Sequence, residues 1–283
     1  MLLTNRFVYV HEPKTGGSFV TYVMTELHGG LTDVRGLRII NQTLRRRLPT
    51  VSFHLDRLGS SPTPPAPREA PYGALYRWND HGTCREIPRT YRSRQILATV
   101  RNPFETYVSE YLFGWWKRPE YLPHYRRRVP DFSRRYPTFP DLTFAGYMTL
   151  LHEAWALPES RDLYGPDGTG YLTERFIRYY FRAGDARHTG DMYPVRFLRT
   201  ARLNEDLQCF LLSTDYKPED VEFVKSLDYV LPVGGAEIGF ADRAASHDWA
   251  SRYTSELREI VRKKDELIFD LFPEFDVPLQ PAR

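Results

Sequence analysis

A short turn with two glycines, close to the amino end, constrains the fold more than any other feature of this chain. Residues 8–19 have the sequence VYVHEPKTGGSF. The run RFVYV at 6–10 predicts a buried strand, and residues 18–28 predict a helix that ends at the glycine pair 29–30. A strand, a tight turn and a helix in this order are typical of α/β proteins.

A second unit of the same kind follows later in the chain. Residues 95–100, QILATV, predict a strand, and a helix is expected from Pro103 to about Trp116, with Asn102 as its N-cap. A further strand is expected at 195–200, a helix at 204–212, and one long terminal helix over 249–271. The alternation predicts a mainly parallel central sheet flanked by helices, and the 283 residues predict a single domain, 1–283.

Composition excludes several classes of protein. The net charge of +3 is too small for a strongly basic nucleic-acid-binding protein. Cys84 and Cys209 form neither a disulfide framework nor a metal set, and reduced thiols are expected. No apolar run reaches a membrane span of about 18 to 20 residues, and the start MLLTNRFVYV lacks the long apolar region and small-residue cleavage site of a signal peptide, so none is expected. A cytoplasmic protein is expected, although a longer parent with a removed anchor would look the same.

Two segments are expected to lie at the surface. Residues 60–71, SSPTPPAPREAP, are too rich in proline for a regular element and predict a loop. Residues 117–140 combine the arginines at 126–128 and 134–135 with aromatic residues and are expected to be loop-rich. These arginines are best interpreted as a solvated face. The sharper hypothesis is that this segment receives an acidic or sugar-like acceptor.

The glycine turn has the composition of an anion-binding loop. Glycines allow close approach of the backbone, and the amides at a helix N-terminus favour a negative charge, which the ammonium of Lys14 would reinforce. In a Walker A loop the lysine follows the glycines, whereas Lys14 precedes them. The alternative is a flexible turn with a solvated lysine, and the turn alone does not decide between the two.

Arg101 supplies a second cation at the end of a predicted strand. Ligands of open α/β sheets bind outside the carboxyl ends of the strands, so Lys14 and Arg101 are expected on the same edge. The alternative for Arg101 is a structural ion pair. Ser109 follows two helical turns later and would mean little by itself.

The pair PKTGGSF and RNPFETYVSEY resembles the carbohydrate sulfotransferase family that carries a PKTGGTS loop and an RxP...S element. The resemblance implies a three-layer, P-loop-like α/β domain that uses 3'-phosphoadenosine 5'-phosphosulfate (PAPS) as sulfuryl donor. It implies that Arg101 and Ser109 clamp the 3'-phosphate, while Phe19 replaces a second hydroxyl residue of the family loop. The residues implied to cradle the 5'-phosphate are Lys14, Thr15, Gly16, Gly17 and Ser18.

A histidine segment extends the resemblance. The sequence HGTCREI at 81–87 is similar to the family pattern H-x-T-A-x-E-I, which implies that His81 is the general base for a hydroxyl of a carbohydrate or similar acceptor. His54 is a rival base, and His81 could instead cap a helix opened by Thr83. In-line transfer would then use Lys14 to stabilise the leaving phosphate, and no metal is required. Looser similarity covers RLNEDL at 202–207 and the terminal segment from 252.

Three other classes of protein remain as alternatives. A P-loop-like nucleotide kinase is the first, and the missing Walker order weighs against it. A non-catalytic nucleotide-binding module is the second, but binding alone does not need both Lys14 and His81. An RNA-binding protein is weaker still, because no aromatic-basic RNA motif accompanies the small net charge.

Overall fold

The fold is described from a computed structural model that describes residues 1–34, 71–155, 169–182, 189–227 and 249–276. The chain divides into two compact units. The first unit comprises Met1–Arg101, Tyr179–Ala183 and Gly190–Gly234, and the second unit comprises Asn102–Arg178, Gly184–Thr189 and Gly235–Arg283. The expectation of one domain over 1–283 stays a prediction. Residues 60–70 and His54 lie outside the described residues.

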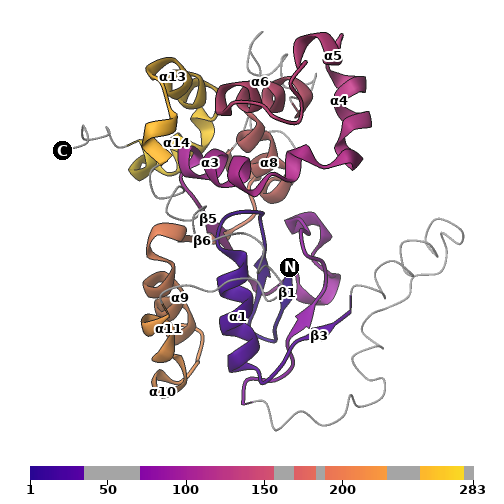
Figure 1. The fold of residues 1–283 in the computed structure, drawn as a ribbon. Coiled ribbons are helices and arrows are strands. Elements are labelled where there is room, and N and C mark those ends of the chain that lie inside the picture. The colour runs from indigo at the N-terminus through magenta and orange to yellow at the C-terminus, as the bar shows by residue number, and fades with distance from the viewer. Residues whose placement is uncertain (35–70, 156–168, 183–188, 228–248, 277–283) are drawn as a thin grey trace, which may run out of the picture. The chain divides into compact units, whose positions relative to one another are not determined.

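The first unit contains a sheet of six strands among the described residues, in the order β3-β4-β1-β2-β5-β6. Figure 1 labels β1, β3, β5 and β6 of this sheet, together with α1 and α9. The pairs β2/β5, β5/β6 and β3/β4 are parallel, and β1 pairs antiparallel with both β2 and β4. The expected α/β class with a mostly parallel sheet is therefore confirmed. The strands are β1 (Leu2–Leu3), β2 (Phe7–Val10), β3 (Thr32–Asp33), β4 (Tyr76–Arg77), β5 (Gln95–Val100) and β6 (Val195–Arg199).

One apolar core holds the sheet and its helices together. Every residue of β2 is buried, and so are the last five of β5, as expected for strands covered on both faces. Helices α1 (Gly17–Leu27) and α9 (Leu203–Leu212) contribute buried side chains to the same cluster, and the rings of Phe7 and Phe210 meet edge to face at 4.8 Å. The short helices α10 (Pro218–Val221) and α11 (Phe223–Ser226) complete it. Because β2 is part of this core, the core fixes the position of the glycine turn that follows β2.

The second unit is helical in its described part. Asn102 accepts a hydrogen bond from the amide of Phe104 at 3.0 Å, and Pro103 occupies the first turn, so the predicted helix start is confirmed. The first helix ends before Gly114, which adopts φ 69°, rather than near Trp116. The helices are α3 (Pro103–Phe113), α4 (Leu122–Arg128), α5 (Phe132–Arg135), α6 (Phe144–Trp155), α8 (Tyr171–Tyr180), α13 (Ser255–Lys264) and α14 (Glu266–Leu271), and the last two residues of α8 belong to the first unit.

The expectation of one long terminal helix is wrong. Residues 249–252 form a 3-10 turn, and Thr254 starts α13 as an N-cap that accepts from the amide of Leu257 at 3.3 Å. Asp265 then interrupts the helix with φ −109° and ψ 26°. Its buried carboxylate accepts hydrogen bonds from the Tyr107 hydroxyl at 2.7 Å and the Thr173 amide at 2.8 Å. These contacts outweigh the helical periodicity of the sequence.

The expectation of a loop-rich segment at 117–140 is only partly correct. The segment contains the helices α4 and α5. Pro123 lies in the first turn of α4, where a missing amide proton is tolerated, so it does not prevent the helix. Across the whole described part, none of the helices combines the length and apolar character needed to cross a membrane.

Candidate functional site

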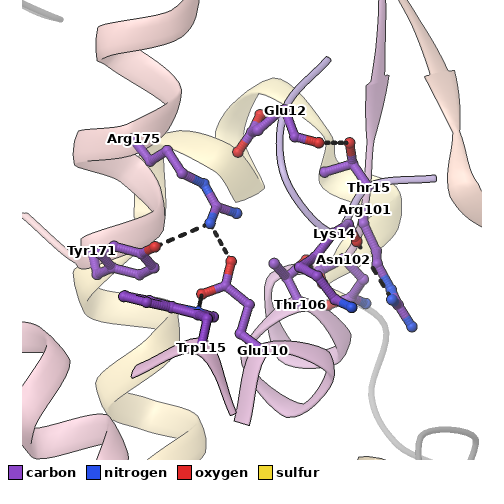
Figure 2. A network of polar contacts seen from close by, with 10 residues as sticks. All are labelled: Glu12, Lys14, Thr15, Arg101, Asn102, Thr106, Glu110, Trp115, Tyr171 and Arg175. Carbon is purple, nitrogen blue, oxygen red and sulfur yellow. Dashed lines mark hydrogen bonds and ion pairs between the residues drawn. The ribbon is translucent and has the colours of Figure 1, made fainter. Parts of the chain in front are cut away.

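Three parallel strands end at one edge of the sheet, and polar residues follow each of them. The glycine turn follows β2, Arg101 follows β5 and Thr200 follows β6. The guanidinium of Arg101 donates from Nη1 to the carbonyl oxygen of Lys14 at 3.5 Å (Figure 2). The structure thus brings Lys14 and Arg101 together at the edge where the sequence places them.

The turn between β2 and α1 has a backbone that requires glycine at one position. Lys14 adopts φ 66°, and Gly16 adopts φ 103° as the N-cap of α1. A Cβ atom on Gly16 would lie 2.6 Å from Cδ2 of Leu203. Left-handed backbone and close approach together explain why the chain has glycine here. Non-glycine residues in this region are strained, and such strain is common where a backbone clamps a ligand.

The N-terminus of α1 has the composition of a helix end that favours a negative charge. The first turn of α1 contains no acidic side chain, so nothing within the helix neutralises the positive end of its dipole. The amides of Phe19 and Val20 both bond to the carbonyl of Gly16, at 3.1 Å and 3.4 Å. The amides of Gly17 and Ser18 precede these and belong to the helix positions that have no intrahelical acceptor.

The hydroxyl of Thr15 is used inside the loop. It donates to the carbonyl of Glu12 at 2.9 Å and lies 2.7 Å from the hydroxyl of Thr99, which in turn lies 2.9 Å from the hydroxyl of Tyr9. Burial is the main cause that raises the pKa of Tyr9, so the chain of hydroxyls stays neutral. Thr15 therefore shapes the loop with its side chain, and a contact to phosphate would use its backbone amide.

Thr200 is a residue that the sequence analysis missed. Its hydroxyl lies 2.6 Å from the carbonyl of Thr15 and 3.1 Å from the carbonyl of Val100, and so it ties the ends of the three strands together. The rule that site residues follow the carboxyl ends of parallel strands points to it once the strand is known to end at Arg199, whereas the predicted strand at 195–200 included Thr200.

His81 lies on the same unit as the loop. Its side chain is exposed, and its main chain is held by the hydroxyl of Tyr179, which donates to the His81 carbonyl at 3.2 Å. The amide of Thr83 donates to Oε2 of Glu86 at 2.9 Å. Thr83 and Glu86 thus form a capping box at the start of the 3-10 helix Cys84–Glu86, and a capping role of His81 stays a prediction.

His11 is a second histidine at the loop, and the sequence analysis did not select it. Its ring lies 5.2 Å from the ring of His81, measured between centroids. A Cβ atom on Gly17 would come within 1.9 Å of the His11 ring, so this ring packs directly on the turn. Burial is the main cause that lowers the pKa of His11 to about 3, with the amino-terminal charge, His81 and Arg77 acting in the same direction. His11 is therefore neutral at physiological pH.

Ser109 and the basic segment 117–140 belong to the second unit. Ser109 is half-buried in α3, and its pairing with Arg101 stays a prediction. The arginines at 126–128, 134 and 135 are exposed. Arg134 pairs with Asp131 at 2.9 Å, and Arg135 pairs with Glu153. Two of the five arginines therefore already have acidic partners, which favours the solvated-face interpretation for those two.

A buried ionic network in the second unit was not predicted. The guanidinium of Arg175 pairs with the carboxylate of Glu110 and also donates to the Tyr171 hydroxyl at 3.2 Å (Figure 2). The indole of Trp115 donates to the other carboxylate oxygen of Glu110 at 3.1 Å. The charges satisfy each other, which is typical of a structural network.

Cysteines and metal ligands add no further centre in the described residues. Cys84 is buried, and burial raises the pKa of its thiol to about 12, which makes it unreactive. Cys209 is also a free thiol. Within the described ranges, no group of three or more His, Cys, Asp or Glu side chains is arranged to hold a metal ion.

Comparison with known proteins finds no family model that matches the chain, and no curated protein matches it either.

Proposed function

We propose that this chain is a sulfotransferase that moves a sulfuryl group from PAPS to a hydroxyl of a carbohydrate or similar acceptor. The observation that carries the proposal is the position of Lys14 and Arg101 on one sheet edge, with the Arg101 guanidinium at the Lys14 carbonyl. Two cations beside a glycine turn fit a nucleotide that carries phosphate at both ends. A P-loop-like fold and a three-layer arrangement are part of the same proposal.

The proposed reaction is an in-line displacement at sulfur. The acceptor oxygen attacks the sulfur atom, the bond from sulfur to the bridging phosphate oxygen breaks, and 3'-phosphoadenosine 5'-phosphate (PAP) leaves. Lys14 stabilises the negative charge that develops on the departing phosphate. His81 accepts the proton of the attacking hydroxyl, a role that contributes about 10²- to 10⁴-fold. Atoms and charges balance with these two side chains.

The positions of the loop atoms support the role of the 5'-phosphate site. The amides of Gly17 and Ser18 start α1, and its first turn carries no acidic side chain. Lys14 is half-buried at the start of this turn, and its left-handed backbone (φ 66°) is part of the shape of the loop. In this proposal the loop binds through main-chain amides, and the Thr15 hydroxyl keeps the shape of the loop.

A calorimetric titration with PAP, ATP and 5'-AMP tests the proposal. Selective binding of PAP is expected, and Arg101→Ala should weaken it about 10- to 100-fold, because a hydrogen bond to a charged group contributes about 1.5 to 3 kcal/mol. Arg94→Ala is the matched control. Arg94 is exposed and precedes the opposite end of β5, so the same charge is removed away from the site. An unchanged affinity for PAP is expected for this variant.

The other outcomes of the titration point to the alternatives. A preference for ATP over PAP would favour a P-loop-like nucleotide kinase. If the protein binds PAP but sulfuryl transfer persists in both Lys14→Ala and His81→Ala, the proposed catalytic roles of Lys14 and His81 are wrong. Equal losses of affinity in Arg101→Ala and Arg94→Ala would show a non-specific charge effect and would contradict the assignment of Arg101.

A further inference from the structure

The ring of His11 is the feature of the loop that the proposed mechanism leaves unused. It follows β2 directly and packs on the backbone of Gly17, where a Cβ atom would come within 2.0 Å of both Cδ2 and Nε2 of the ring. Any other residue at position 17 would have to displace the ring. The absence of a side chain at Gly17 therefore makes room for His11 as well as for close approach of a ligand.

The same ring has two aromatic neighbours. The Tyr9 ring is nearly parallel to it, with an interplanar angle of 21° and centroids 6.1 Å apart. The His81 ring lies at 5.2 Å with an interplanar angle of 56°. Tyr9 is fully buried in the sheet. His11 therefore connects a rigid strand to an exposed histidine.

His11 and His81 differ in their suitability as a base. With a pKa near 3, His11 carries no charge at neutral pH and is a weak base. It therefore does not repel a proton held by His81 and does not replace His81 as the base. What remains for His11 is contact through its ring.

We propose that His11 is a positioning residue whose ring, packed on Gly17, holds the ring of His81 beside the glycine turn. This inference rests on the proposed function, in which His81 takes the proton of the acceptor. It assigns to His11 no contact with the reacting atoms.

The main chain of His81 is held by bonds that do not orient its ring. Its amide donates to Oδ1 of Asn79 at 3.3 Å, and its carbonyl accepts from Tyr179. A side chain on an exposed segment loses rotamer freedom when it acts as a base, and a packed neighbour reduces that cost in advance. The contact with His11 is made by the ring itself.

Two substitutions separate ring packing from nitrogen chemistry. His11→Ala removes the ring and is expected to lower kcat on the order of 10²-fold, as expected when a reacting group is misplaced by about 1 Å. His11→Phe keeps a ring without nitrogen atoms and is expected to restore most of kcat. The Kd for PAP is expected to stay within about threefold of wild type in both variants. If His11→Phe is as slow as His11→Ala, or if His11→Ala keeps wild-type kcat, the positioning role is wrong.

Gly17→Ala provides an independent variant. The new Cβ atom must displace the His11 ring, so Gly17→Ala is expected to lower kcat in the same way as His11→Ala. At saturating PAPS, which removes the effect of Gly17→Ala on binding by the loop, the double variant Gly17→Ala with His11→Ala is expected to have a kcat no lower than that of the slower single variant, because both changes remove the same contact. Losses that multiply in the double variant would contradict a shared mechanism.

A spectroscopic readout keeps the inference separate from the proposed function. The ring signals of His81 in a ¹H–¹³C NMR spectrum are expected to shift in His11→Ala, and to shift less in His11→Phe, whether or not the protein turns over PAPS. Unchanged His81 signals in His11→Ala would show that the rings do not meet and would overturn the inference. Failure of the wild-type protein to bind PAP, with shifted His81 signals, would instead overturn the proposed function alone.

Discussion

The two units of this chain differ in where their charged side chains lie. In the first unit, Lys14 and Arg101 follow strand ends and are half-buried, with the neutral hydroxyls of Thr15 and Thr99 buried beneath them. In the second unit, Arg175 and Glu110 are 4% and 1% exposed and satisfy each other. A charge that is paired in the interior supports the architecture, whereas the two cations of the first unit follow the ends of parallel strands, which is the edge where α/β proteins bind their ligands.

Glu12 shows that the contrast concerns roles and not residue types. Glu12 is buried in the first unit next to the loop, and its carboxylate contributes to raising the pKa of the buried Tyr180. Burial is the larger cause of that shift. The buried acid Glu12 thus acts on a neutral hydroxyl, that of Tyr180, whereas Lys14 and Arg101 lie at the edge of the sheet.

Removing one partner of the buried ion pair should have the largest effect on stability. Arg175→Ala leaves the carboxylate of Glu110 buried without its cation, and the free energy of unfolding is expected to fall by about 3 to 5 kcal/mol. Denaturation in urea measures it. Arg134→Ala is the matched control, because Arg134 and Asp131 are 82% and 65% exposed and such pairs contribute about 0 to 1 kcal/mol. Equal losses in the two variants would contradict a structural role for the buried pair.

Lys14→Ala should instead affect turnover and leave the fold intact. Loss of a charge that stabilises the leaving group is expected to lower kcat about 10²- to 10³-fold. Steady-state kinetics with PAPS measures this, and the urea midpoint should stay close to that of wild type. Lys225→Ala, at an exposed lysine of the same unit, is expected to change neither quantity. A stability loss as large as that of Arg175→Ala would place Lys14 in the architecture.

Three glycine substitutions separate backbone strain from lack of space in the first unit. Gly16→Ala faces both φ 103° and a contact of 2.6 Å with Leu203, and it is expected to lower stability by more than the 1 to 3 kcal/mol of backbone strain alone. Gly30→Ala faces only φ 148°, and Gly190→Ala faces neither, so the losses should decrease in that order. Thermal unfolding measures them. A loss in Gly190→Ala that matches Gly16→Ala would refute the geometry of the turn.

A pH dependence is expected from Asp265 in the second unit. Burial is the main cause that raises the pKa of its carboxyl to about 6, whereas an unfolded chain has about 3.9. Between these values the native state binds more protons than the unfolded state, so the contribution of Asp265 to stability falls as pH rises from about 4 to about 6, on the order of 3 kcal/mol. Asp265→Asn should lack this slope in pH-dependent urea unfolding. An identical slope in the variant would exclude Asp265 as its source.

Local signals predicted the parts of the fold that local chemistry controls. The strand at 95–100 was predicted with its observed bounds, and Asn102 and Pro103 marked the start of α3. The two-residue strands β1 and β4 were missed, because such short pairings depend on the partner strand more than on their own residues. The terminal helix was wrong because the interaction of Asp265 with Tyr107 links positions 158 residues apart.

The part of the candidate site that follows the ends of predicted strands could be predicted from the sequence. Lys14 and Arg101 were found because each follows an apolar run, and the same rule applies to His11 and Thr200. His11 directly follows β2, so the rule could have selected it, but only Lys14 and the residues after it were considered from the sequence. Its packing on Gly17 depends on three-dimensional contacts. The pairing of Arg175 with Glu110 was not predictable, because the sequence offers 39 basic residues as possible partners.

The most direct test of the central claim is to locate PAP on the protein by NMR. The account predicts that PAP shifts the backbone amide signals of Gly16, Gly17 and Ser18, and that Arg101→Ala reduces these shifts at equal PAP concentration while Arg94→Ala does not. Binding of PAP that leaves the amides of Gly16 and Gly17 unshifted would contradict the proposal that the half-buried cations Lys14 and Arg101 and the adjoining turn bind a phosphate ligand.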